Sequence, residues 1–354
     1  MGLRHAAILS AVLAQLVYPG GVSAWAEEQS AFPLTGIFAG KVKADGKQKQ
    51  AADLSGIACD KASGFPRRCV VVDDDSQHYQ FADLTDKGLA AGEIVQVTTA
   101  KDGDKALDFD GEAVAFADGK FYVLGSHGRP RDVEQKLSPA VIEKRRQVAS
   151  VIYRIDPNRA APQFDVSDKL TAVLKEIGKI SEYWDRTLDQ NGLTLEGMAV
   201  KAQTLYIGLR APVLGEAHRA AVVSVGLDVI FGGKSGSGTL TELDLGGRGI
   251  RDLTAYGDGF LILAGPSADP DSTLQINDGD YLVYYWKIGQ LPQALGSVAG
   301  FKFEDDGKTK WAKPEAIAAF DSSAADSLRL LTLFDGPKAN GAGRLVAVKS
   351  PPSQ

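Results

Sequence analysis

The chain has 354 residues, with 39 Lys and Arg against 45 Asp and Glu, and its formal net charge at pH 7 is −6. This acidic balance argues against a general nucleic-acid binder, because a negative surface repels phosphate groups instead of releasing their counterions. We therefore expect small molecules, cell-envelope components or cations as partners, and no nucleic acid.

The first 26 residues have the pattern of a cleaved secretory signal. A basic start containing Arg4 is followed by an apolar run from Ala6 to Tyr18 and by an Ala-x-Ala site that ends at Ala26. The apolar run is shorter than the ~20 residues that cross a bilayer, so we expect cleavage after Ala26 rather than a membrane anchor. The mature chain, residues 27–354, is expected to form a single domain without a membrane span. We expect it in the periplasm or outside the cell.

The sequence contains two cysteines, Cys59 and Cys69, and both fall in one predicted β-hairpin. An even, close pair of cysteines in an exported protein predicts a disulfide bond. Two buried free thiols are the alternative.

A repeated pattern organises the rest of the chain. Each copy has an apolar residue, a polar residue, a small or acidic residue and then a short apolar strand, and a second apolar run follows after a turn. The pattern occurs five times, at residues 54–58, 111–115, 195–199, 250–254 and 314–318. Short strands and turn signals at these intervals predict an all-β fold, a β-propeller. Five blades can be counted, and a degenerate sixth is left open.

Two segments interrupt the repeat with helical patterns. Residues Leu170 to Trp184 have the apolar spacing of an amphipathic helix. Residues Pro139 to Ala149 form a second expected helix, with Ser138 as its N-cap. The strand around Leu34 to Lys41 has no blade of its own, and we expect it to pair with the last blade and close the ring.

The polar member of each copy is expected to face the central channel, which the innermost strand of every blade lines. These five residues are Ser55, Glu112, Glu196, Arg251 and Glu315. Three carboxylates at one depth repel one another unless something neutralises them. Either Glu112, Glu196 and Glu315 hold a divalent cation such as calcium, or a salt-bridged network closes on Arg251. A third reading is that the polar groups only pin neighbouring blades by hydrogen bonds to backbone amides.

A second polar set follows the second strands of the blades, so it should gather at one rim of the ring. Arginines at this rim could fix an anionic group beside carboxylates. The residues expected to bind substrate are Asp74, Arg129, Arg210, Arg251 and Asp335. His127 follows an equivalent strand and could transfer a proton near neutral pH together with Glu196, or it could cap a turn. The charged segment Arg129 to Gln147 is either a basic lid over this pocket or a solvated helix face.

The chain resembles a bacterial family of exported proteins of unknown function. The segments that carry the resemblance cover most of the mature chain and include Gly125 to Arg129, Ile207 to Arg210, Leu245 to Leu253 and Phe334 to Pro337. The family implies no established activity. The chain is similar, more distantly, to propellers with phytase-like esterase activity, and this likeness covers the repeat but no catalytic constellation. Ser55 stands where three other copies have Glu, which puts a complete carboxylate ring in doubt.

Two functions from different classes remain open. The first is a non-catalytic envelope module that binds a small anionic ligand or an envelope component at the rim. The second is a cation-assisted hydrolase of an ester or phosphoester. We favour the binding module, because the polar ring can be explained structurally without turnover.

Overall fold

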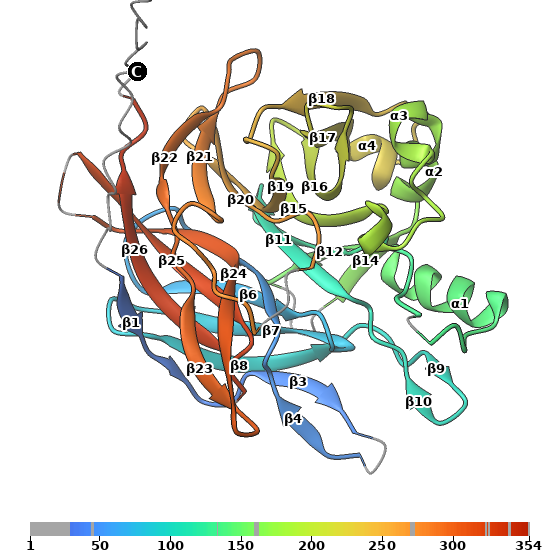
Figure 1. The fold of residues 1–354 in the computed structure, drawn as a ribbon, viewed down its shortest axis with the longest axis horizontal. Helices are drawn as coiled ribbons and strands as arrows, with labels where there is room; N and C mark the ends of the chain where they lie inside the picture. Colours follow the sequence, from blue (N-terminus) through green and yellow to red (C-terminus); the bar gives the residue numbers. More distant parts are fainter. Residues whose placement is uncertain are drawn as a thin grey trace, which may run out of the picture.

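The computed structural model describes residues 29–43, 46–132, 134–158, 163–269, 273–322, 324, 326–338 and 341–352. The expected export signal, residues 1–26, lies outside these residues. The described chain forms five larger sheets that follow one another in sequence, from blue to red in Figure 1, around a common axis. The innermost strand of each sheet packs against that of the next, and the fifth packs against the first. The expected all-β propeller with short helical insertions is confirmed, with five blades among the described residues.

Each blade begins at the channel with the strand that carries the repeat. Blade one consists of β5 (Leu54–Cys59), β6 (Arg67–Asp73), β7 (His78–Leu84), β8 (Leu89–Gln96) and the short parallel strand β2 (Leu34–Thr35). Blade two consists of β11 (Gly111–Ala117), β12 (Lys120–Gly125), β13 (Ile152–Asp156) and β14 (Gln163–Ser167). Blade three consists of β15 (Thr194–Lys201), β16 (Thr204–Leu214), β17 (Arg219–Gly226) and β18 (Thr239–Leu243).

The last two blades follow the same order. Blade four consists of β19 (Gly249–Tyr256), β20 (Gly259–Gly265), β21 (Leu282–Trp286) and β22 (Gln293–Ser297). Blade five consists of β24 (Lys308–Phe320), β25 (Ser327–Asp335), β26 (Ala342–Lys349) and β1 (Ser30–Phe32), and β23 (Phe301–Asp305) pairs with the start of β24. Two small hairpins lie outside the blades: β3 (Ala39–Val42) with β4 (Gln48–Gln50), and β9 (Lys101–Asp102) with β10 (Lys105–Ala106).

The ring is closed by a segment just before the one expected. Strand β1 pairs with β26 as the outer strand of blade five, with Ser30 opposite Leu345. The prediction that Leu34 to Lys41 closes the ring is wrong, because β2 pairs with β8 of blade one and β3 pairs with β4. Pro33 separates β1 from β2. A proline has no N–H to donate to a strand ladder, so the chain leaves blade five at this residue.

The helices lie in the insertions between strands. Helix α1 (Pro139–Ala149) begins where the sequence predicts, and the Ser138 side chain accepts a hydrogen bond from the Val141 N–H at 3.3 Å. The single helix expected from Leu170 to Trp184 is broken into α2 (Leu170–Glu176) and α3 (Gly178–Ser181), because Ile177 adopts an extended backbone. A 3₁₀ turn, η1 (Leu188–Gln190), and α4 (Leu227–Ile230) complete the set. None of the described helices is long and apolar enough to cross a membrane.

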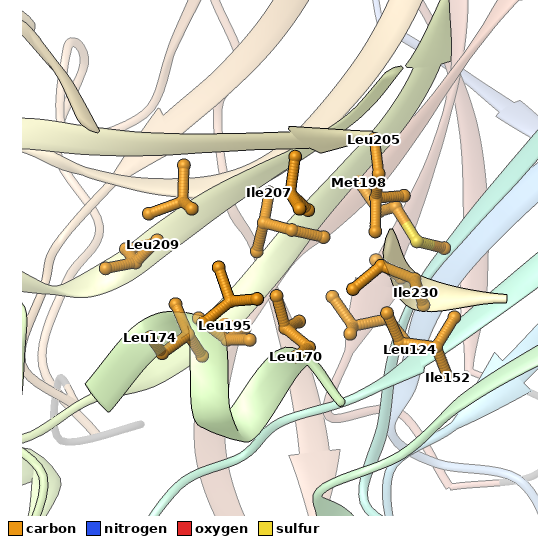
Figure 2. Close-up of a cluster of buried hydrophobic side chains, with 14 of the residues drawn as sticks. Leu124, Ile152, Leu170, Leu174, Leu195, Met198, Leu205, Ile207, Leu209 and Ile230 are labelled. Carbon is orange, nitrogen blue, oxygen red and sulfur yellow. The ribbon is translucent and has the colours of Figure 1, made fainter. Parts of the chain in front are cut away.

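The hydrophobic core lies between neighbouring blades and not in the channel. One cluster joins blades two and three and packs against α2, as Figure 2 shows, and its labelled members are Leu124, Ile152, Leu170, Leu174, Leu195, Met198, Leu205, Ile207, Leu209 and Ile230. Burying a side chain of this size contributes about 1.5–3 kcal/mol. Because apolar packing between sheets holds the blades together, the channel is left free for polar side chains.

The predicted disulfide bond is confirmed. Cys59 and Cys69 face each other across β5 and β6 and are bonded. Among the described residues no free cysteine occurs.

Candidate functional site

Every inner strand has a β-bulge at its polar repeat residue. The pairing of β5 with β6 runs from Leu54 opposite Asp73 to Gly56 opposite Val72, which leaves Ser55 without a partner. The same shift in pairing leaves four further residues without a cross-strand partner, namely Glu112, Glu196, Arg251 and Glu315. A bulge adds one residue to a strand and re-aims its side chain. Five equivalent bulges therefore direct five polar side chains into the channel, where all five line one cavity, as the repeat predicts.

The cavity has a volume of about 430 Å³ and lies where the second strands of the blades end. Four of the expected rim residues also line it, namely Asp74, Arg129, Arg210 and Asp335. So do four residues that stand two positions before a ring residue: Asp53, Asp110, Thr194 and Lys313. Sequence reasoning missed these four. The signal for them was their constant spacing of two residues from the ring position, which is the period of a strand face.

Two buried arginines neutralise two of the three ring carboxylates. The Arg251 Nε atom lies 2.8 Å from Glu315 Oε2 and 3.1 Å from Glu196 Oε2, and Arg251 Nη2 donates to Glu315 Oε1. The Arg210 Nη1 atom donates to Glu196 Oε1 at 2.8 Å. Charge-assisted pairs of this kind are strong and occupy the oxygens that a metal would need. The salt-bridged network closing on Arg251, one of the arrangements open from the sequence, is the one that the structure contains.

The calcium site expected from Glu112, Glu196 and Glu315 stays a prediction, and its three members have different surroundings in the structure. Glu196 and Glu315 face guanidinium groups, whereas Glu112 is the one member of the three that belongs, among the residues the structure describes, to a group of carboxylates that could hold an ion. That group consists of Glu112, Asp74 and Asp110, each with one oxygen within 4.8 Å of the others.

Glu112 and Asp74 have no compensating charge partner among the described residues. Glu112 is 9% exposed and makes no hydrogen bond or ion pair there. Burial, together with repulsion from Glu196 and Asp110, raises its pKa well above the usual value. Burial and the nearby Asp53 and Glu112 raise the pKa of Asp74 in the same direction. Burial also raises the pKa of Asp110 to about 6, although the Ser126 hydroxyl donates a hydrogen bond to it.

Asp335, which was expected to bind substrate, is already paired. Lys313 Nζ lies 3.0 Å from its carboxylate. Burial and a hydrogen bond with Asp335 raise the pKa of the neighbouring Asp53 to about 9. Arg210 is saturated as well, because its Nε and Nη2 atoms donate to the carbonyls of Ser267 and Ala268.

Unpaired positive charge reaches the cavity from the insertion in blade two. Arg129 follows β12, and Arg145 belongs to α1, the helix of this insertion that Figure 1 labels. Both residues line the cavity. Neither forms an ion pair within the described part of the chain, and the Arg145 Nε atom is buried without a partner. Arg131, from the same insertion, is instead paired with Asp269 at 2.7 Å. Part of the expected basic lid thus contacts the cavity. The sequence placed both residues in this lid, but it named only Arg129 as a ligand-binding residue.

His127 lies outside the cavity. Its side chain is fully buried, its backbone φ is 57°, and its Nδ1 atom lies 2.9 Å from the Gly125 carbonyl oxygen. Burial lowers its pKa to about 4, so the imidazole is neutral near pH 7. The expected proton transfer by His127 is not supported by this placement, which fits the alternative role in a turn. Glu196 does line the cavity, where its carboxylate contacts Arg210 and Arg251.

Comparison with known families gives one match. Residues 157–348, more than half of the chain, match the family described as "Protein of unknown function (DUF3616)". The chain belongs to this family. In this DUF3616 member the matched part contains Glu196, Arg210, Arg251 and Glu315, whereas the acidic group of Asp74, Asp110 and Glu112 lies before it. No curated protein matches the sequence.

Solved structures are similar to this DUF3616 member at low identity. An exo-β-1,3-galactanase from Phanerochaete chrysosporium is 8% identical with a TM-score of 0.44, over 91% of this chain and 64% of that one. An α-L-arabinofuranosidase from Fusarium graminearum is 11% identical with a TM-score of 0.42, over 89% and 96%. An exo-β-1,3-galactanase from Clostridium thermocellum is 12% identical with a TM-score of 0.43, over 91% and 62%. The chain spans less than two thirds of both galactanases.

These structures are described as a galactanase or an arabinofuranosidase, not as phytase-like esterases. Likeness at this level carries no argument about this chain, and we draw no activity from it.

Proposed function

We propose that the protein binds a small anionic ligand in the cavity at the end of the propeller channel. The observation that carries this proposal is the pair of guanidinium groups, Arg129 and Arg145, that line the cavity without an ion pair among the described residues. The other cations deep in the site, Arg210, Arg251 and Lys313, are held by carboxylates of the protein. A guanidinium group presents planar, parallel donors that match a carboxylate or a phosphate.

The size of the cavity supports the same proposal. A volume of about 430 Å³ lies within the roughly 300–1,000 Å³ typical of small-molecule sites. Polar groups converge on it from every blade, since each inner strand contributes its bulged residue. A site of this kind orients one small ligand rather than a flat partner surface.

Thermal melting of the mature chain tests the proposal with inorganic phosphate, phenyl phosphate and glucuronate as probes. We expect at least one probe to raise the melting temperature in a saturable way, and we expect the Arg129→Ala, Arg145→Ala double variant to lose the response. Lys144→Ala is the matched control, because Lys144 lies beside Arg145 on α1 but is exposed and outside the cavity. No response to any probe, or an equal response in the double variant, would contradict the proposal.

A second candidate function is cation-assisted hydrolysis of an ester or phosphoester. It is favoured by the unpartnered carboxylates of Asp74 and Glu112, which line the same cavity as the free arginines. A cation held there would polarise a carbonyl or phosphoryl oxygen, and the arginines would stabilise the developing negative charge. Release of p-nitrophenol from its acetate and phosphate esters tests this activity. Turnover above that of a Glu112→Gln variant supports hydrolysis, and equal rates exclude it for these substrates.

We also propose that the mature chain works in the periplasm or outside the cell. The signal-like pattern of residues 1–26 supports this location, and so does the Cys59–Cys69 disulfide, since such bonds persist in oxidising compartments. Cell fractionation with N-terminal sequencing is the test. We expect the exported chain to begin at Glu27, whereas an unprocessed chain in the cytoplasm would contradict export.

A further inference from the structure

We propose that Asp74, Asp110 and Glu112 form a binding site for one calcium ion on the acidic side of the cavity. This inference rests on the proposed function in so far as the ion and the anionic ligand share that cavity. The proposed ligands differ from the set Glu112, Glu196 and Glu315 that the repeat suggested. Only Glu112 is common to the two sets.

The three carboxylates come from two adjacent blades and meet at the channel. Asp74 follows β6, Asp110 directly precedes β11, and Glu112 occupies the bulge of β11. One oxygen of each lies within 4.8 Å of the others. Calcium binds oxygen at about 2.3–2.6 Å, so oxygens on opposite sides of one ion lie up to about 5 Å apart. The three oxygens can therefore surround a single calcium ion without rearrangement of the blades.

Glu112 provides an observation independent of the clustering. Its side chain is nine-tenths buried, lines the cavity and has no hydrogen bond or ion pair among the described residues. The other two ring glutamates are each held by a buried arginine. Burying a carboxylate without a partner is costly. The cavity thus presents to its interior a carboxyl group that has no hydrogen-bond or ion-pair partner among the described residues.

Asp110 is held in place by a short chain of hydrogen bonds. The Ser126 hydroxyl donates to Asp110 Oδ2, and the Gly128 N–H donates to Ser126 Oγ at 3.1 Å. Outer hydrogen bonds of this kind orient the ligands of a metal ion. Ser126 and Gly128 lie in the turn after β12, the second strand of blade two. This turn therefore supports Asp110, which directly precedes β11, the first strand of the same blade.

The donor set selects the class of ion. All three donors are carboxylate oxygens, which suit hard cations and not zinc or copper. Magnesium binds oxygen at about 2.0–2.1 Å in a strict octahedron, whereas calcium accepts a longer and more flexible shell and so demands less exact placement of carboxylates from two blades. Three carboxylates leave further positions on calcium, which water or the anionic ligand would fill.

Calorimetric titration of the mature chain with calcium chloride, after removal of metals by a chelator, tests the site. We expect one saturable site, and we expect Glu112→Gln and Asp110→Asn each to weaken the affinity at least tenfold. Asp75→Asn is the matched control, because Asp75 also lines the cavity but is paired with Lys41 at 2.9 Å. Its affinity should stay within about twofold of wild type.

Melting without calcium separates an ion site from a structural role. Removing one charge relieves repulsion, so metal-free Glu112→Gln should melt no lower than the metal-free wild type. A lower melting temperature would show that Glu112 stabilises the fold by itself and would overturn the proposal. No saturable binding at calcium concentrations on the order of 10 mM, above the ~1 mM of weak extracellular sites, would overturn it too. So would equal affinity in wild type, Glu112→Gln and Asp110→Asn.

The calcium site and anion binding can fail separately. Phosphate-induced stabilisation that persists in chelator, in a chain that binds no calcium, would overturn only the calcium site. Calcium binding without any response to phosphate, phenyl phosphate or glucuronate would overturn only the proposed anion binding.

Discussion

Arg251 and Glu315 form a bidentate ion pair that joins blades four and five at the channel. The Arg251 Nε atom lies 2.8 Å from Glu315 Oε2, Nη2 donates to Glu315 Oε1, and both residues are buried. Both occupy the bulge of their inner strand. The repeat that builds the blades thus also supplies the link between them.

Replacing Arg251 should destabilise the fold strongly. In Arg251→Ala the buried carboxylate of Glu315 loses its partner, and breaking a buried pair in this way costs about 3–5 kcal/mol. Urea denaturation measures the change in the free energy of unfolding. The double variant Arg251→Met, Glu315→Leu should recover most of the loss, because it leaves no unpaired charge at these positions. A loss below about 1 kcal/mol in Arg251→Ala would show that the pair is not important for stability.

Removing the disulfide should cost about 2–3 kcal/mol. Cys59 and Cys69 are separated by ten positions, and a closed loop of that length restricts the unfolded chain by this amount. We expect the Cys59→Ala, Cys69→Ala variant and the reduced wild type to unfold at similarly lowered urea concentrations. If the reduced wild type were as stable as the oxidised one, the bridge would contribute nothing to the mature fold.

His127 should make the fold sensitive to acid. Burial lowers its pKa to about 4 in the folded chain, below the ordinary histidine value of 6.5. Since the unfolded chain then takes up the proton more readily, stability is lost as the pH falls from about 6.5 to about 4. His127→Asn removes this titration and tolerates the positive φ of 57°. We expect the variant to lose less stability than wild type over that range, with unchanged ligand response. A changed ligand response would restore a role for His127 in the site.

Asp252 should make the fold less stable as the pH rises, which is the opposite of the effect of His127. It accepts hydrogen bonds from the backbone N–H groups of Leu253 and Ile317, each at 2.7 Å, and burial raises its pKa to about 8. Since the folded chain holds this proton more tightly than the unfolded chain, stability falls as the pH rises from about 4 to about 8. In Asp252→Asn the single side-chain oxygen can still accept one of the two hydrogen bonds, and nothing titrates. The variant should lose less stability than wild type between these pH values. Parallel stability curves for the two proteins would contradict the prediction.

The repeat made the ring and its rim predictable. Ser55, Glu112 and Glu196 hold the same position in successive copies of one pattern, and equivalent positions in equivalent blades must meet at the common axis. The disulfide and the start of α1 were predictable for a similar reason. A cross-strand cysteine pair and an N-cap serine each depend only on neighbours close in sequence.

The sequence alone thus determined the propeller, its five blades and which polar side chains enter the channel, because strand period and repeat phase are local properties. Only the tertiary structure decided which of these charged side chains form ion pairs with one another. Arg210 and Arg251 form ion pairs with Glu196 and Glu315, whereas Glu112 lies close to Asp74 and Asp110. Such partners lie on different strands or blades, and their pairing depends on how the bulges and the blade-two insertion place each side chain in three dimensions.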